Sequence, residues 1–231
     1  MLSQTPQYLI EKKVPFFRGR EILDRAKFTK YLHPLSEYLE MISSSPLAYH
    51  PPSSPTPGYP ANERMVLSRV YLQFGIMLDY ITGEHAHGKK PSLSDILRKS
   101  LASDKADLAH PGSEAHEAAN ERLKQLIPDR HLRLFPQFGI TSDWPPTYLV
   151  HGSSDSAVLA HESRYMHKLL EKAGVETTLS VQEGFEHSFD YEPDAEAVHG
   201  SRLFDSVGEF LKEHLEKARW NAHVKQEFRA A

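Results

Sequence analysis

Two short polar segments contain the residues best suited to chemistry. The first, His151-Gly152-Ser153-Ser154-Asp155, follows the apolar run Thr147–Val150, and the second, Glu183–Phe189, contains His187. A carboxylate that accepts a hydrogen bond from one imidazole nitrogen fixes the tautomer of the ring, which leaves the other nitrogen to act as a base. The same carboxylate stabilises the imidazolium that forms during acyl transfer. Asp155 and His187 are therefore the candidate catalytic residues.

A succession of strand, helix, strand and helix is expected to position these two segments. Apolar runs predict strands over 147–150 and 175–181, and apolar residues at helical spacing predict helices over 160–173 and 201–217. This order is typical of a parallel βαβ unit, in which both strands end at the same edge of the sheet. Because neighbouring strands lie about 5 Å apart, the carboxylate and the imidazole are predicted to lie within hydrogen-bond reach, about 2.6–3.2 Å.

The stretch Pro145–Leu215 resembles the C-terminal part of the esterase/lipase and prolyl-oligopeptidase-like α/β-hydrolases. The resemblance rests on PPTYLVHGSSDSAV, on the EKAGVE turn and on EGFEHSFD before the last helix. It implies the family's acid at Asp155, its base at His187, and hydrolysis of a small ester or peptide substrate through a serine acyl-enzyme, with no cofactor. The expected fold class is α/β, with the C-terminal half of an α/β-hydrolase sheet preceded by a mainly helical, lid-like region.

The serine nucleophile of that family has no recognisable counterpart. Its G-x-S-x-G elbow should precede Asp155, and this motif occurs nowhere in the sequence. Ser113 follows Gly112 but opens a polar helix, and the HGGG-type oxyanion loop is also missing from the sequence. The chain therefore looks like a hydrolase whose first half was lost through truncation or divergence. It is expected to hydrolyse nothing at an enzymatic rate by itself, and the alternative function is a non-catalytic remnant that acts as a binding or interaction module.

Three segments are expected along the chain. Residues 1–144 form a mainly helical lid or connecting region with a proline-rich loop at 46–60, residues 145–217 carry the C-terminal strands and helices, and residues 218–231 form a polar tail. Within the first segment, apolar spacings of three and four predict a single helix over 63–82. Its inward face would be core or the wall of an acyl pocket, and comprises Val70, Phe74, Met77 and Ile81.

Three smaller features leave alternatives open. The strand 147–150 needs a neighbour on its outer side, for which Tyr8-Leu9-Ile10 is the candidate, and an uncovered strand predicts self-association through the exposed sheet edge. His85 and His87 form an H-x-H that could bind a metal, but no third ligand can be nominated, which favours an ordinary loop. The two glutamates that flank the candidate base, Glu183 and Glu186, could pair with it, although solvated positions are favoured.

The composition of the chain limits the classes of partner that it can bind. The 231 residues are 39% hydrophobic and 25% charged, which is typical of a soluble globular protein, and the net charge of -4 provides no basic field for nucleic acid. No apolar run approaches the roughly 20 residues that cross a bilayer, and the first residues lack the apolar stretch of a signal peptide. The chain has no cysteine, which excludes disulfides and thiolate sites. A cytoplasmic location without a membrane span is expected.

Overall fold

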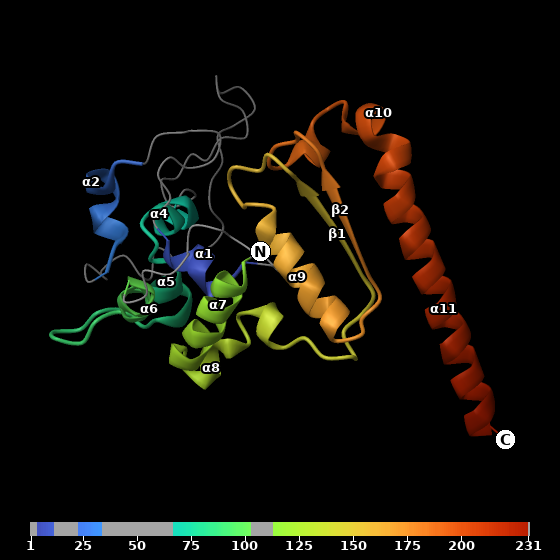
Figure 1. Ribbon diagram of the computed structural model, residues 1–231, viewed down its shortest axis with the longest axis horizontal. Helices are drawn as coiled ribbons and strands as arrows, with labels where there is room; N and C mark the ends of the chain where they lie inside the picture. Colours follow the sequence, from blue (N-terminus) through green and yellow to red (C-terminus); the bar gives the residue numbers. More distant parts are fainter. Residues whose placement is uncertain (1–3, 12–22, 34–66, 103–112, 231) are drawn as a thin grey trace. The chain divides into compact units, whose positions relative to one another are not determined.

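A computed structural model describes residues 4–11, 23–33, 67–102 and 113–230 (Figure 1). The chain divides into two compact units, Met1–Phe138 and Gly139–Ala231, whereas the sequence places the boundary at residue 144. The proline-rich loop at 46–60 lies outside the described residues. Among the helices that the structure describes, none has both the length and the apolar character needed to cross a membrane.

The described part of the N-terminal unit is helical, with one isolated antiparallel bridge between His87 and Lys90. Its core contains fully buried leucines from several of these helices, among them Leu78, Leu97 and Leu123. The helices are α1 (Pro6–Ile10), α2 (Arg25–Phe28), α4 (Leu67–Gln73), α5 (Met77–Thr82), α6 (Leu93–Ala102), α7 (Glu114–Leu126) and α8 (Asp129–Leu132), and the short 3-10 turns are η1 (Thr29–Tyr31) and η4 (Pro136–Phe138).

The single helix predicted over 63–82 is wrong, because the chain forms α4 and α5 with a break between them. Gly75 lies in the break with a φ of 63°, and a Cβ at this position would lie 2.2 Å from the carbonyl oxygen of Ile10. The approach of α1 therefore interrupts the helix at a residue that only glycine can occupy without strain. Val70 and Met77 are buried as predicted, but Ile81 is 47% exposed. Residues 63–66 lie outside the described part.

The strand candidate Tyr8-Leu9-Ile10 is also wrong, because these residues belong to helix α1. Thr5 is the N-cap, with its side chain accepting a hydrogen bond from the Tyr8 backbone N–H, and Pro6 occupies the first turn. Both features favour a helix start.

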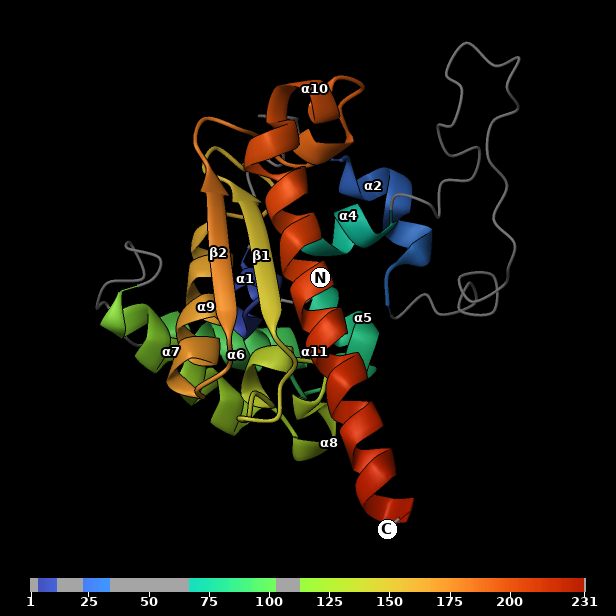
Figure 2. The ribbon, with the colours of Figure 1, turned by 90° about the vertical axis from the view of Figure 1, so that its right-hand side faces the viewer.

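The C-terminal unit is a mixed α/β structure that contains the predicted parallel βαβ unit. Strands β1 (Thr147–Gly152) and β2 (Thr177–Gln182) pair in parallel from Thr147 opposite Thr177 to Gly152 opposite Gln182. Helix α9 (His161–Lys172) connects them. Figures 1 and 2 show α9 on one face of the strands and α11 (Phe204–Ala230) on the other.

Side chains that alternate along β1 contact the two helices. Leu149 packs against the cluster of Met166, Leu170 and Val175 on the α9 side. Tyr148 points the other way, with its ring 5.3 Å from that of Phe210 in α11. Within the described residues β1 pairs with β2 alone, and most residues of both strands are only half-buried.

The remaining elements follow β2. They are η5 (Phe189–Tyr191), α10 (Ala195–His199) and η6 (Gly200–Arg202), which lead into α11. The helix predicted over 201–217 begins at Phe204 and continues to Ala230, so the expected polar tail at 218–231 is helical through Ala230.

Candidate active site

The loops that follow β1 and β2 are joined by hydrogen bonds at the carboxyl end of the strands. The Ser153 N–H donates to the carbonyl of Gln182 at 2.8 Å, and the Ser154 N–H donates to that of Phe185 at 3.0 Å. The Gly184 N–H donates to the Ser153 hydroxyl at 2.8 Å. These bonds tie the segment with the candidate acid to the segment with the candidate base.

Gly152 allows the two loops to approach this closely. A Cβ on Gly152 would lie 2.2 Å from the backbone carbonyl oxygen of Phe185, far inside van der Waals contact. Any larger residue would push the second loop away from the first. The glycine of the His151-Gly152 pair is therefore a requirement of the site geometry.

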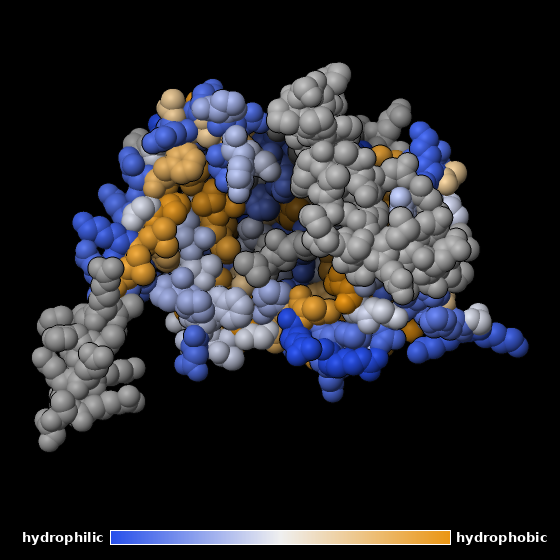
Figure 3. Space-filling model, turned by 180° about the vertical axis from the view of Figure 1, so that it is seen from behind, coloured by the Kyte–Doolittle hydropathy of each residue, from blue (hydrophilic) through white to orange (hydrophobic). Residues whose placement is uncertain are grey.

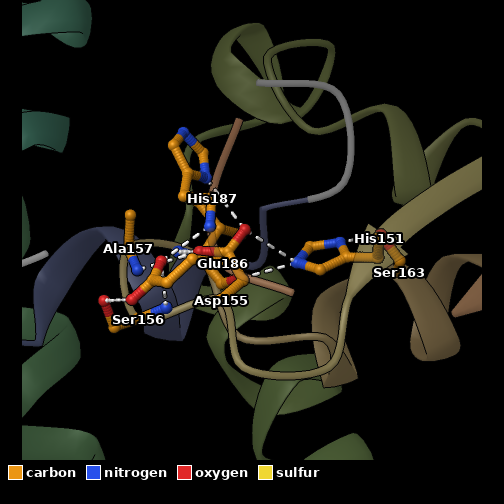
Figure 4. A network of polar contacts seen from close by, with 8 residues as sticks. His151, Asp155, Ser156, Ala157, Ser163, Glu186 and His187 are labelled. Carbon is orange, nitrogen blue, oxygen red and sulfur yellow. Dashed lines mark hydrogen bonds and ion pairs between the residues drawn. The ribbon is translucent and has the colours of Figure 1, made fainter. Parts of the chain in front are cut away.

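Asp155 and His187 lie within hydrogen-bond distance, which confirms the predicted geometry. Nδ1 of His187 lies 2.8 Å from Oδ2 of Asp155 (Figure 4). The other carboxylate oxygen, Oδ1, accepts from the backbone N–H groups of Ala157 at 2.9 Å and Val158 at 2.8 Å. Asp155 is 6% exposed, whereas the His187 side chain is 39% exposed. The carboxylate is thus buried and fixed, and the imidazole is accessible from solvent.

Asp155 is held in its charged form by its hydrogen bonds. Burial alone raises the pKa of the carboxyl, but hydrogen bonds from His151, from the Val158 and Ala157 N–H groups and from His187 outweigh it and lower the pKa to about 2. Because an ionised carboxylate can only accept, the proton of this contact belongs to His187 Nδ1. In the neutral ring, Nε2 of His187 is therefore the nitrogen that can accept a proton.

A second histidine contacts the same carboxylate, and the sequence analysis missed it. His151 Nε2 lies 3.2 Å from Asp155 Oδ2 and 2.7 Å from the carbonyl oxygen of Val158. Its Nδ1 lies 2.7 Å from the hydroxyl of Ser163 in α9. Burial alone lowers the pKa of His151, but Asp155 and the Val158 carbonyl raise it above its ordinary value. The signal in the sequence was a histidine four residues before the acid, at the end of a strand.

Glu186 connects the two loops through hydrogen bonds from backbone N–H groups and a serine hydroxyl. Its carboxylate accepts from the backbone N–H groups of His187 at 2.6 Å and Ser156 at 3.2 Å, and from the Ser156 hydroxyl. Burial raises the pKa of Glu186, but these hydrogen bonds outweigh it and lower the pKa. Glu183 is exposed, as expected.

Two features follow the base directly. Ser188 has a φ of 62°, the one non-glycine residue with positive φ in the described part of the chain. Behind the loop, the rings of Phe185 and Phe189 lie 4.4 Å and 5.0 Å from that of His199 in α10. This aromatic cluster supports the loop from within, while the left-handed Ser188 turns the chain sharply after His187.

The H-x-H segment lies beside a third histidine in the N-terminal unit. The rings of His33 and His85 stack at 4.3 Å with planes 6° apart, and His87 meets His33 edge-on at 4.9 Å. His33 and His85 line a cavity of about 320 Å³. Since an ion must lie close to the plane of each imidazole that binds it, two parallel stacked rings do not share one. In this arrangement His33 and His85 pack as stacked aromatic side chains.

Ser113 is a helix cap, which agrees with its exclusion as a nucleophile. Its hydroxyl accepts from the backbone N–H of His116 at 3.2 Å, at the start of α7. This is the ordinary role of a serine at an N-cap.

Comparisons with known proteins point away from the hydrolase families. No protein-family model matches the chain, and no solved structure matches it. A stretch of 72 residues is 36% identical to a non-reducing polyketide synthase of Aspergillus calidoustus, and one of 72 residues is 35% identical to a non-reducing polyketide synthase of Penicillium brevicompactum. The matches cover 30% and 31% of this chain but only 3% of each relative.

The resemblance to esterase/lipase and prolyl-oligopeptidase-like α/β-hydrolases is therefore wrong as a family assignment. The proteins that match are polyketide synthases, and neither a hydrolase family model nor a hydrolase structure is found. The acid–base geometry described above does not depend on that assignment, because it rests on the positions of the side chains.

Proposed function

We propose that Asp155 and His187 are the acid–base part of an acyl-transfer site. The observation that carries the proposal is the 2.8 Å contact between Asp155 Oδ2 and His187 Nδ1. A base so oriented removes a proton from an attacking hydroxyl or water as the new bond to the acyl carbon forms. The imidazolium then returns this proton to the leaving group, and the ionised Asp155 stabilises the imidazolium in between.

The proposed substrate is an acyl group of the polyketide kind, held as an ester, thioester or amide. The support is the partial similarity to the two polyketide synthases. A polyketide is an acyl chain, and its release or transfer is substitution at an acyl carbon. The similarity covers only 3% of each relative, so the substrate of this chain is a proposal and is not given by the names of those proteins.

The lack of a G-x-S-x-G nucleophile motif in the sequence limits the rate of hydrolysis expected of this chain by itself. With no serine in a G-x-S-x-G setting, water is the available nucleophile, and no oxyanion donors are identified. Loss of one oxyanion donor typically lowers the rate on the order of 10²–10³-fold. We therefore propose slow, His187-dependent hydrolysis rather than turnover at an enzymatic rate.

The test is hydrolysis of p-nitrophenyl acetate and of an acyl N-acetylcysteamine thioester by residues 1–231. His187→Ala should lower the rate above the buffer background on the order of 10²-fold, the usual contribution of a positioned base. Asp155→Asn should also lower it, whereas His167→Ala should not, because His167 pairs with Glu171 along α9. Equal rates for the wild type and His187→Ala would refute the proposal. Fast turnover lost in His187→Ala would mean that the chain contains a nucleophile.

A second candidate function is an interaction module, favoured by apolar surface on the C-terminal unit. In α11, Leu211 is 53% exposed and Leu215 is 59% exposed, one turn apart. Figure 3 shows hydrophobic surface along the described part of α11. Exposed apolar patches favour association with another protein surface. Sizing in solution separates this function from the first, because an acyl-transfer site does not require association.

A further inference from the structure

Oδ2 of Asp155 lies close to two histidines. Oδ2 lies 2.8 Å from Nδ1 of His187 and 3.2 Å from Nε2 of His151. In Figure 4 the two imidazoles reach the carboxylate from different sides. The acyl-transfer chemistry proposed above uses His187 and has no role for His151.

His151 is itself held at both ring nitrogens. Its Nε2 lies 2.7 Å from the Val158 carbonyl oxygen, and because a carbonyl can only accept, Nε2 carries a proton. Its Nδ1 lies 2.7 Å from the hydroxyl of Ser163, which is 5% exposed. The side chain of His151 is 10% exposed. The ring is therefore a rigid donor, fixed by β1, by the connection after it and by α9.

We propose that His151 is a positioning residue for the acyl-transfer site, holding Asp155 Oδ2 where it accepts from His187. The proposal rests on the proposed function. The backbone N–H groups of Ala157 and Val158 anchor only the Oδ1 side of the carboxylate. On the Oδ2 side, His151 presents one Nε2–H that is shared between the Val158 carbonyl oxygen at 2.7 Å and Oδ2 at 3.2 Å.

The surroundings of His151 fit a permanent hydrogen-bond donor. Burial lowers the pKa of His151, but contacts with Asp155 and with the Val158 carbonyl raise it above its ordinary value, which favours the protonated ring. Second partners of this kind orient the groups that they touch, and their loss typically lowers activity about 10–100-fold. His151 acts through Asp155 and does not reach the reacting atoms.

The test compares His151→Ala, which removes the donor, with His151→Gln, whose side-chain N–H₂ can replace it. The first readout is the NMR exchange lifetime of the His187 Nδ1 proton, and the second is the His187-dependent hydrolysis rate. His151→Ala should shorten the lifetime and lower the rate about tenfold. His151→Gln should restore most of both. His167→Gln is the matched control in the same unit and should change neither.

Two results would overturn the proposal: an unchanged lifetime in His151→Ala, or a folded His151→Gln variant as defective as His151→Ala. If His151→Ala does not fold, Ser163→Ala decides. Removing the hydroxyl loosens the ring, so an intermediate loss of lifetime supports the proposal and no loss overturns it. If the wild type shows no His187-dependent hydrolysis, the proposed function fails, and the exchange lifetime still decides whether His151 positions Asp155.

Discussion

Replacing Asp155 by asparagine should destabilise the C-terminal unit in a pH-dependent way. The amide oxygen can still accept from the Ala157 and Val158 N–H groups, as Oδ1 does in the wild type. The amide nitrogen then takes the place of Oδ2 and faces the N–H groups of His187 and His151. Donors that face donors in a buried site leave hydrogen bonds unmade.

The size of the effect follows from the lowered pKa of Asp155. A pKa that falls from 3.8 in the unfolded chain to about 2 in the folded protein corresponds to roughly 2 kcal/mol of folding free energy at neutral pH. Asp155 is 6% exposed, so screening by solvent removes little of this. Since the folded pKa is depressed, the stabilisation is present above pH 3.8 and is lost as the pH falls through about 2.

Urea denaturation followed by tryptophan fluorescence measures this directly. Both tryptophans, Trp144 and Trp220, belong to the C-terminal unit, so the signal reports the unit that contains the site. At pH 7 the Asp155→Asn variant should be less stable by about 2 kcal/mol. The difference in unfolding free energy between the wild type and Asp155→Asn should be about 1 kcal/mol smaller at pH 3 than at pH 7. Asp143→Asn, at an exposed position of the same unit, is the matched control and should change little.

The reasoning would be refuted by a difference between wild type and Asp155→Asn that is the same at pH 7 and pH 3. That result would mean that the carboxylate charge contributes nothing to folding. Equal stability of the wild type and Asp155→Asn at pH 7 would be a stronger contradiction. It would mean that the hydrogen-bonded charge of Asp155 does not stabilise the folded unit.

Three further predictions concern packing and association. Leu170→Ala, at a fully buried position of the α9 core, should lower the free energy of unfolding by about 2–5 kcal/mol in the same assay. Gly152→Ala places a methyl group 2.2 Å from the Phe185 carbonyl oxygen. Both the thermal midpoint of unfolding and the His187-dependent hydrolysis rate should therefore fall. An unchanged rate would show that the loops after β1 and β2 need not touch. The wild type should associate through the apolar face of α11 and the edge of β1, which has no neighbouring strand other than β2 among the described residues. Leu211→Glu with Leu215→Glu should then reduce its mass in light scattering, and a wild-type monomer would contradict this.

The elements around the site were predictable because their signals are local. Apolar runs ending in His151-Gly152 and near Gly184 indicate two strands, and the helix between them makes the strands parallel. The meeting of Asp155 and His187 follows from that connection. The role of His151 did not follow, because it depends on how the loop after β1 folds back toward the end of its own strand.

The N-terminal unit was harder to predict because distant segments decide its local structure. The apolar stripe continues across Gly75, yet the helix breaks there since the chain must pass close to Ile10. Periodicity carries no information on that contact. The helix at Pro6–Ile10 was predictable in principle, because Thr5 and Pro6 are a cap and a first-turn residue.

The most direct test is whether Asp155 fixes the proton of His187 on Nδ1 and so leaves Nε2 to accept a proton. Nitrogen-15 NMR of histidine-labelled residues 1–231 measures the tautomer, with His187→Gln identifying the signal. At a pH where the ring is neutral, the account predicts a protonated Nδ1 in the wild type and a loss of that preference in Asp155→Asn. A proton found on Nε2 in the wild type, or the same tautomer in both proteins, would contradict it.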